Sequence, residues 1–179
     1  VRAGGYRMAW IGYAQNDEKK SIKPIVHAGH EAGYLSGINI SLADIAMSRG
    51  PTGTAMSTGK PGVNNDTAAN TLYGPWRSAA IERGYLSSVA LPLAVGDRTI
   101  GTLNIYAGEV NAFSDPEVEL LTELANDLAY GITALRTRIE HRLANEALRE
   151  TNLRLEKAID ELRATQQEVV RKERLGAIG

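Results

Sequence analysis

A run of small residues is the first stretch of this sequence that could do chemistry, because it is similar to a phosphate-binding loop. A loop that holds a nucleoside triphosphate has four residues between its glycines and a Ser or Thr after its Lys. Here five residues separate Gly53 from Gly59, and Pro61 follows Lys60. The run therefore lacks the hydroxyl that would hold magnesium. It predicts a segment that crosses the sheet closely, which small residues allow.

Histidines and serines are the next candidates. His27 and His30 are three residues apart near the end of a predicted strand, and His141 is distant in the sequence. A metal or a haem would need further ligands, so exposed polar histidines are the alternative interpretation. Ser87 and Ser88 lie in a predicted strand without the Gly-x-Ser-x-Gly turn that presents a nucleophile. We therefore predict no catalytic residues and no metal site.

Polar and planar side chains between residues 54 and 85 could hold a small molecule. The run from Asn64 to Asp66 fits a turn, but its side chains could also orient a ligand in an apolar pocket. Tyr73, Trp76 and Tyr85 could stack on a planar ligand, or they could pack in the core. The candidate ligand contacts are Thr54, Asn65, Asp66, Tyr73, Trp76 and Tyr85.

Composition excludes several classes of function. The chain has 20 basic and 21 acidic residues without a basic patch, so we expect no nucleic-acid partner. It has no cysteine, which excludes disulfides and thiolate chemistry and is compatible with a reducing compartment. No apolar run approaches the ~20 residues that span a bilayer. We expect a cytoplasmic fragment of a longer protein, whose parent could be anchored to a membrane elsewhere.

The elements that must position these residues can be read from hydrophobic periodicity. The predicted segments are strands at 6–14 and 22–28, a short helix at 44–47, an irregular segment at 50–62, an edge strand at 63–66, a helix at 76–83, and strands at 87–93 and 99–106. Hairpins with helices gathered beside them predict an α+β fold. We expect an antiparallel sheet of five or six strands with flanking helices.

A long helix follows the last strand. Ser114, Asp115 and Pro116 form a helix start, and no proline follows. Apolar residues then recur at helical spacing, and the distal part forms a heptad seam. The seam positions are Leu148, Asn152, Leu155, Ile159, Leu162, Gln166 and Val169. A helix of ~60 residues would be ~90 Å long. We therefore expect its distal half to pack on a second copy as a parallel coiled coil, the alternative being a solvated single helix.

In their order, the sequence motifs resemble the GAF domains of bacterial sensor histidine kinases. The resemblance covers about residues 4–140. The matching segments are Gly5 to Ala14, Gly53 to Ala55, Thr58 to Pro61, Asn65-Asp66, Trp76-Arg77, Gly84-Tyr85, Ser87 to Leu93, Ile100 to Tyr106 and Phe113 to Asp115. In this family a helix precedes the first strand, and here it would be missing or reduced to Val1 to Gly4. Glu173 to Gly179 resembles the opening of a histidine-kinase dimerisation helix, whose phosphoacceptor histidine would lie downstream.

The resemblance implies an organisation and a function. It implies a GAF-like sensor domain at 1–116, a helix at 117–147 that packs on the domain and on the dimer partner, a coiled-coil linker at 148–172, and the start of a dimerisation helix at 173–179. The chain would be the sensing and dimerising input module of a two-component sensor histidine kinase. The parent would phosphorylate a response regulator, and this fragment would not be an enzyme.

The resemblance also places any ligand between the sheet and the segment 50–76. No cofactor is identifiable, and an unknown small molecule could bind there. One alternative is a purely structural dimerisation module with an empty pocket. Another is an enzyme similar to the methionine-sulfoxide-reducing GAF proteins, which depend on cysteines that this chain lacks. The Asn-Lys-Phe-Asp stretch of cyclic-nucleotide-binding members is also missing.

Overall fold

The computed structural model of the chain describes residues 5–38 and 40–176. Its contacts divide the chain into two units, Val1–Ile132 and Thr133–Gly179. The first unit contains every strand and short helix, and one long C-terminal helix begins there and supplies the second unit. The predicted remnant of a first helix at Val1 to Gly4 lies outside the described residues, as do Ala177 to Gly179.

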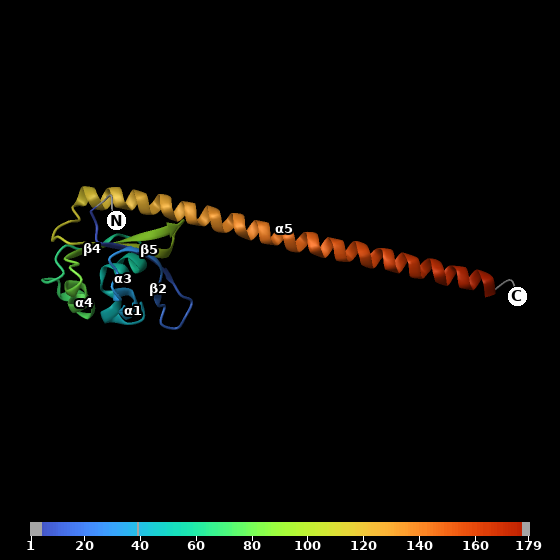
Figure 1. The fold of residues 1–179 in the computed structure, drawn as a ribbon, viewed down its shortest axis with the longest axis horizontal. Helices are drawn as coiled ribbons and strands as arrows, with labels where there is room; N and C mark the ends of the chain where they lie inside the picture. The colour runs from blue at the N-terminus through green and yellow to red at the C-terminus, as the bar shows by residue number, and fades with distance from the viewer. Residues whose placement is uncertain (1–4, 39, 177–179) are drawn as a thin grey trace. The chain divides into compact units, whose positions relative to one another are not determined.

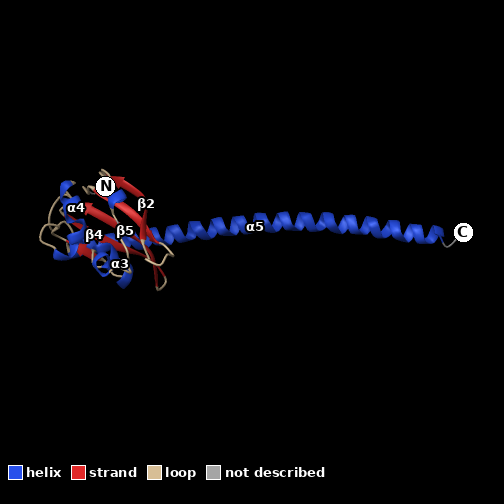
Figure 2. Cartoon of the chain, turned by 90° about the horizontal axis from the view of Figure 1, so that it is seen from below, coloured by secondary structure: helices blue, strands red, loops and turns tan. Residues whose placement is uncertain are grey.

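The first unit is built on a five-stranded antiparallel sheet with the order β2-β1-β5-β4-β3. This confirms the predicted α+β class, and Figure 2 distinguishes the strands from the surrounding helices. Two hairpins, β1–β2 and β4–β5, pair with each other through β1 and β5, and the short strand β3 pairs with the outer side of β4. The bounds are β1 Met8–Ala14, β2 Ile22–Gly29, β3 Gly62–Asn64, β4 Ser87–Val95 and β5 Arg98–Ala107.

One face of the sheet is apolar and is covered by the first turns of α5 (Asp115–Gly176). Side chains alternate along a strand, so Leu103 and Ile105 of β5 lie on the same face as their cross-strand partners on β4. From α5, Leu121, Ala125 and Ala129 are buried against this face at four-residue spacing. Figure 1 shows this part of α5 running along the sheet.

The opposite face is covered by short helices and an irregular chain (Figure 1). These elements are α1 Tyr34–Gly37, α2 Ile45–Ser48, α3 Pro51–Thr58, η1 Thr71–Trp76 and α4 Arg77–Glu82. They bury Met8, Trp10 and Tyr106 of the sheet. They also bury polar strand residues on the same face, since Thr102 is 0% exposed and Asn104 is 2% exposed. Both faces of the sheet are therefore closed to solvent at its centre.

The segment 50–62 differs from its prediction as irregular chain, because most of it forms the helix α3. Gly50 is extended at the helix start, Pro51 fixes the first turn, and Gly59 ends the helix in the left-handed conformation at φ 66°. The close crossing does occur: a Cβ on Gly62 would lie 2.3 Å from the Pro51 carbonyl oxygen. The short helices α1 and η1 were not predicted.

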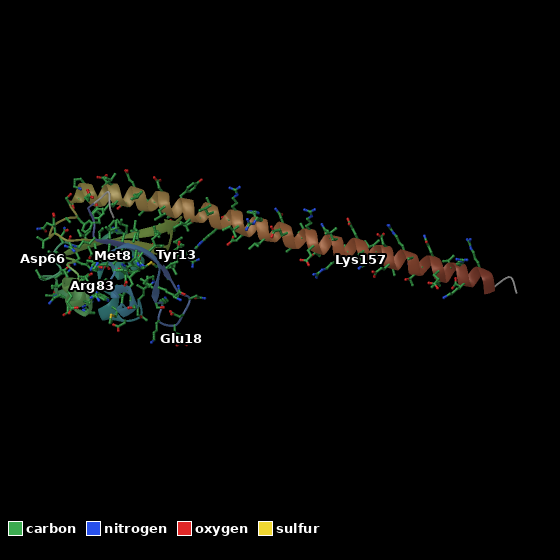
Figure 3. The ribbon with its side chains drawn as sticks, in the orientation of Figure 1. Met8, Tyr13, Glu18, Asp66, Arg83 and Lys157 are labelled. Carbon is green, nitrogen blue, oxygen red and sulfur yellow. The ribbon has the colours of Figure 1, made fainter. Side chains whose placement is uncertain are left out.

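The second unit, Thr133–Gly179, contains the distal part of α5. The apolar seam residues of this helix are exposed in the single chain: Leu148, Leu155, Ile159, Leu162 and Val169 are each 41–60% exposed. Ion pairs within the helix, such as Arg154 with Glu150 at 2.5 Å, lie on its surface. Figure 3 shows Lys157 among side chains that project on every side. Among the described residues, no helix combines the length and the apolar character that crossing a bilayer would need.

The crossing of α3 and β3 can be tested with a glycine pair. Gly62→Ala would force a Cβ against the Pro51 backbone, so we expect the free energy of unfolding to fall by about 1–3 kcal/mol. Gly74→Ala is the matched control, because a Cβ there meets nothing within 4 Å. The control should leave the stability unchanged or raise it by up to about 1 kcal/mol. Urea unfolding measures both, and equal stabilities would contradict this packing.

Candidate functional site

A small cavity lies between the short helices and the face of the sheet that they cover, which carries Thr102 and Asn104. Its volume is about 20 Å³, room for about one water molecule. The described residues around it are Tyr34, Ile38, Ile40, Gly50, Pro51, Thr52, Tyr73, Trp76, Ser88, Val89, Asn104 and Tyr106. All of them are uncharged, and half of them carry a hydroxyl or an amide. The cavity is therefore the place in the first unit where buried polar groups converge.

Tyrosine side chains form the centre of this site. The hydroxyls of Tyr34 and Tyr73 lie 3.2 Å apart and share a hydrogen bond. Trp10 Nε1 donates to the Tyr106 hydroxyl at 3.2 Å. The ring of Tyr34 makes T-shaped contacts with the rings of Tyr85 and Tyr106, with centroid distances of 5.1 and 5.6 Å. The rings are thus held by α1, η1, β1, β5 and the turn before β4, which lie far apart in sequence.

A chain of hydrogen bonds fixes the amide beside the tyrosines. Thr52 Oγ1, on α3, donates to Asn104 Oδ1 at 2.8 Å. Asn104 Nδ2 donates in turn to Thr102 Oγ1 at 2.9 Å. These bonds tie the first turn of α3 to the centre of β5, so the amide presents a fixed edge to the cavity.

Ser88 is the exception to this pairing. It lies on β4 directly opposite Tyr106, and the residue is 3% exposed. Its hydroxyl oxygen has no hydrogen-bond partner of acceptable geometry within the described part of the chain. A buried polar group without a partner is costly, which makes this hydroxyl the least satisfied group in the cavity wall.

Burial keeps the cavity neutral. Removal from water raises the pKa of Tyr34, Tyr73 and Tyr106 well above the ordinary tyrosine value. The phenols therefore remain protonated donors at any physiological pH. A neighbouring charge is that of Arg83, whose guanidinium carbon lies 5.7 Å from the Tyr34 ring centroid and whose Nη2 donates to the Ala32 carbonyl.

The predicted ligand contacts fall into two groups in the structure. Tyr73 and Trp76 line the cavity, and Tyr85 packs directly behind it against Tyr34 and Tyr106. Tyr85 also donates its hydroxyl proton to the His30 carbonyl, outside the cavity. These three aromatic residues are brought together as the prediction requires, and whether they contact a ligand stays a prediction.

The other three predicted contacts lie away from the cavity wall. Thr54 lies on α3 but does not line the cavity, whereas Thr52 of the same helix does. Asn65 Nδ2 donates to the Phe113 carbonyl at 3.1 Å and ties this loop to the start of α5. Asp66 accepts from the backbone of the turn that follows it, which Figure 3 places at the periphery of the unit. Asn65 and Asp66 thus make the loop contacts that the turn interpretation predicts.

Apart from apolar residues and Gly50, sequence reasoning missed five polar residues of the wall: Tyr34, Thr52, Ser88, Asn104 and Tyr106. A signal was present in β5, where Thr102, Asn104 and Tyr106 alternate with Leu103 and Ile105. In a one-sided sheet such alternation places the polar residues in water. Here the second face is covered, so the polar positions line a cavity. The histidines offer no competing site, because His27, His30 and His141 are all exposed.

The comparison with protein families decides the identity of the fold. The profile described as "GAF domain" matches residues 1–133, which is most of the chain. The chain belongs to the GAF domain family. The matched GAF region ends at the point where the contacts separate the first unit from the distal helix. No curated protein gave a significant match.

Solved structures with the same fold include domains of different proteins. The GAF domain region of a protein assigned to the membrane of Geobacter sulfurreducens is 23% identical, with a TM-score of 0.60, over 73% of this chain and 83% of that chain. A domain assigned to a two-component sensor histidine kinase of Sinorhizobium meliloti is 18% identical, with a TM-score of 0.60, over 76% and 86%. Free methionine-R-sulfoxide reductase of Neisseria meningitidis, in complex with its substrate, is 21% identical, with a TM-score of 0.62, over 76% and 73%. These similarities concern the GAF fold.

The buried phenols predict a specific alkaline response. Because folding raises their pKa, the folded protein holds protons that the unfolded chain releases above pH about 10. Their contribution to stability is full below that pH and is lost as pH rises further. We expect their phenolate absorbance to appear together with the loss of helical circular dichroism, and Tyr34→Phe to remove its share of that step. Ionisation of these phenols before unfolding would contradict their burial.

Proposed function

We propose that this chain is the signal-sensing and dimerising input module of a cytoplasmic two-component sensor histidine kinase. The observation that carries the proposal is that the cavity and the long helix α5 lie on opposite faces of one sheet. The cavity lies on one face, and the first turns of α5 cover the other. The same helix continues to Gly176 with an exposed apolar seam. A change at the cavity therefore has a short route to the output helix.

The route runs through adjacent residues of the central strands. Asn104 lines the cavity, while its neighbours Leu103 and Ile105 pack in the cluster that contains Leu121 of α5. Close-packed interiors pass on small displacements because few voids absorb them. A ligand shifts the helix only if it binds two arrangements with different affinity. In this proposal, the ligand-bound and ligand-free sheets hold α5 in different positions.

The exposed seam supports dimerisation through α5. An isolated helix gains little stability from its own hydrogen bonds, and tertiary packing of an apolar face supplies most of it. Burying Leu155, Ile159 and Leu162 against a second copy would remove exposed apolar surface from water. Asn152 and Gln166, at the other core positions, would pair with their counterparts and favour two parallel strands in register.

The kinase assignment is supported by the sensor histidine kinase domain among the similar folds and by the motif that begins at Glu173. In this proposal the phosphoacceptor histidine and the ATP-binding domain belong to the parent, which phosphorylates a response regulator. The fragment itself has no catalytic role. The reductases of similar fold do not suggest a second activity, because this chain has no cysteine to carry their chemistry.

A purely structural dimerisation module is the second candidate. The observation that favours it is the small volume of the cavity, about 20 Å³, which matches an ordered water better than a signal molecule. In that case the hydroxyl network would only stabilise the fold, and α5 would be a passive spacer.

Insertions after Ala164 in the parent protein separate the two candidates. Each inserted residue turns the following helix by ~100° and lifts it by ~1.5 Å. Seven residues restore the seam, because seven residues make two supercoiled turns. We expect autophosphorylation, with and without stimulus, to recur at seven insertions and to be lost or locked at two. Activity that declines smoothly with length would support the passive spacer, and a parent that incorporates no phosphate from ATP would reject the kinase assignment.

A further inference from the structure

We infer that the cavity takes a small uncharged molecule that presents a carbonyl-type oxygen to Ser88 and the neighbouring tyrosine hydroxyls. The inference deepens the proposed function and rests on it for the role of that molecule as a signal. It specifies the chemistry that the wall selects, which is independent of how the output helix works.

The inference depends most on the hydroxyl of Ser88. This hydroxyl is buried at the cavity wall and interacts with the Tyr73 hydroxyl, but no described residue gives it a hydrogen bond of good geometry. The backbone position is fixed by the β4–β5 ladder, so the hydroxyl cannot leave the cavity by a small shift of the strand. A bound acceptor would satisfy this group without any movement of the strand, and a Ser in this place is explained by such an acceptor.

The other hydroxyls add protons that also need acceptors. The Tyr34 and Tyr73 hydroxyls share one hydrogen bond and also interact with the Tyr106 hydroxyl, which itself accepts from Trp10, so this group of hydroxyls carries more protons than the described bonds use. Asn104 Oδ1 already accepts from Thr52. The wall therefore supplies protons from several sides toward the same small space. An oxygen with two lone pairs, as in a ketone, an amide or a lactone, is the group that accepts from two such donors.

The wall excludes charged molecules. None of its described residues carries a charge that could pair with an anion or a cation. Burying an unpaired ion in such surroundings is strongly unfavourable. The raised pKa of the tyrosines has the same physical cause and keeps them as donors. Arg83 stacks over Tyr34 and is occupied by the Ala32 carbonyl, so it does not neutralise an anion in the cavity.

The remaining wall gives the molecule an apolar side. Ile38, Ile40 and Pro51 line it, together with the ring of Trp76. Trp76 packs so closely on Gly50 that a Cβ there would lie 2.5 Å from the ring. Because the cavity has room for only about one water molecule, a larger ligand must displace these apolar residues. The ligand is thus amphipathic, with its oxygen toward the sheet and its hydrocarbon part toward these apolar residues.

Three probes of similar size test the inference on the full chain. Cyclohexanone carries the neutral oxygen, cyclohexanecarboxylate carries a charge, and methylcyclohexane carries neither. Binding is measured by saturation-transfer NMR and by tryptophan fluorescence, since Trp76 lines the cavity. We expect cyclohexanone to bind with the highest affinity. Ser88→Ala should weaken it roughly tenfold while the fold is retained, because this variant removes a hydroxyl that makes no hydrogen bond of good geometry with any described residue.

The matched control is Ser78→Ala, which removes an exposed hydroxyl on α4 and should leave the affinity unchanged. Carboxylate binding as strong as that of the ketone would overturn the inference, and so would equal binding of the hydrocarbon. A ketone that does not bind at all would also overturn it, since the cavity would then hold only water. If the ketone does not bind but kinase activity still returns at seven inserted residues, the inference fails and the proposed function stands. If the ketone binds but activity does not return at seven residues, the proposed function fails and the binding site stands.

Discussion

Burial of both faces of the central sheet is the constraint on which the rest of this structure depends. A strand side chain in this unit cannot reach water at the sheet centre, whichever face it occupies. Polar residues at the centre of β4 and β5 must therefore find partners inside the protein. Asn104 does so through Thr52 and Thr102, and Tyr106 does so through Trp10. Ser88 does not, and the cavity forms where this one requirement is left open.

The same constraint explains the arrangement of the covering elements. On one face, small residues such as Ala125 and Ala129 let α5 lie close to the leucine and isoleucine side chains of the sheet. On the other face, the described residues form several short helices, with Gly50 and Gly59 at the two ends of α3, and these follow the aromatic surface. The first face is uniform and suited to holding a helix in a defined position. The second is varied and suited to recognising a molecule. In the account proposed above, sensing and output use the two sides of one rigid layer.

The sequence predicted what depends on periodicity. The five strands and the long helix follow from alternation and from helical spacing, and the structure contains both; that the heptad seam is a contact between two copies stays a prediction. The helix α3 was missed because Gly53 and the surrounding Thr residues disfavour a helix locally, whereas Pro51 and Gly59 at its ends and its packing on β4 favour one. The aromatic part of the site was predicted from residue type. Ser88 and Asn104 were not, because nothing in one strand reveals that its second face will be covered. Asn65 holds the loop before α5, a role that depends on the distant Phe113, and Asp66 accepts hydrogen bonds within its own turn.

The central claim is that the apolar seam of α5 is the contact between two parallel copies, and cysteine scanning tests it most directly. The chain has no cysteine, so each introduced thiol is the only one in its protomer. In a parallel pair in register, a residue in the seam faces its own counterpart. Leu162→Cys should therefore form an intermolecular disulfide rapidly, while Ala164→Cys, two residues away on the outer face, should form it slowly. Repeating the scan from 155 to 169 should give maxima at seam positions only. Equal rates around the helix, or no disulfide at any seam position, would contradict the parallel dimer and the output route that depends on it.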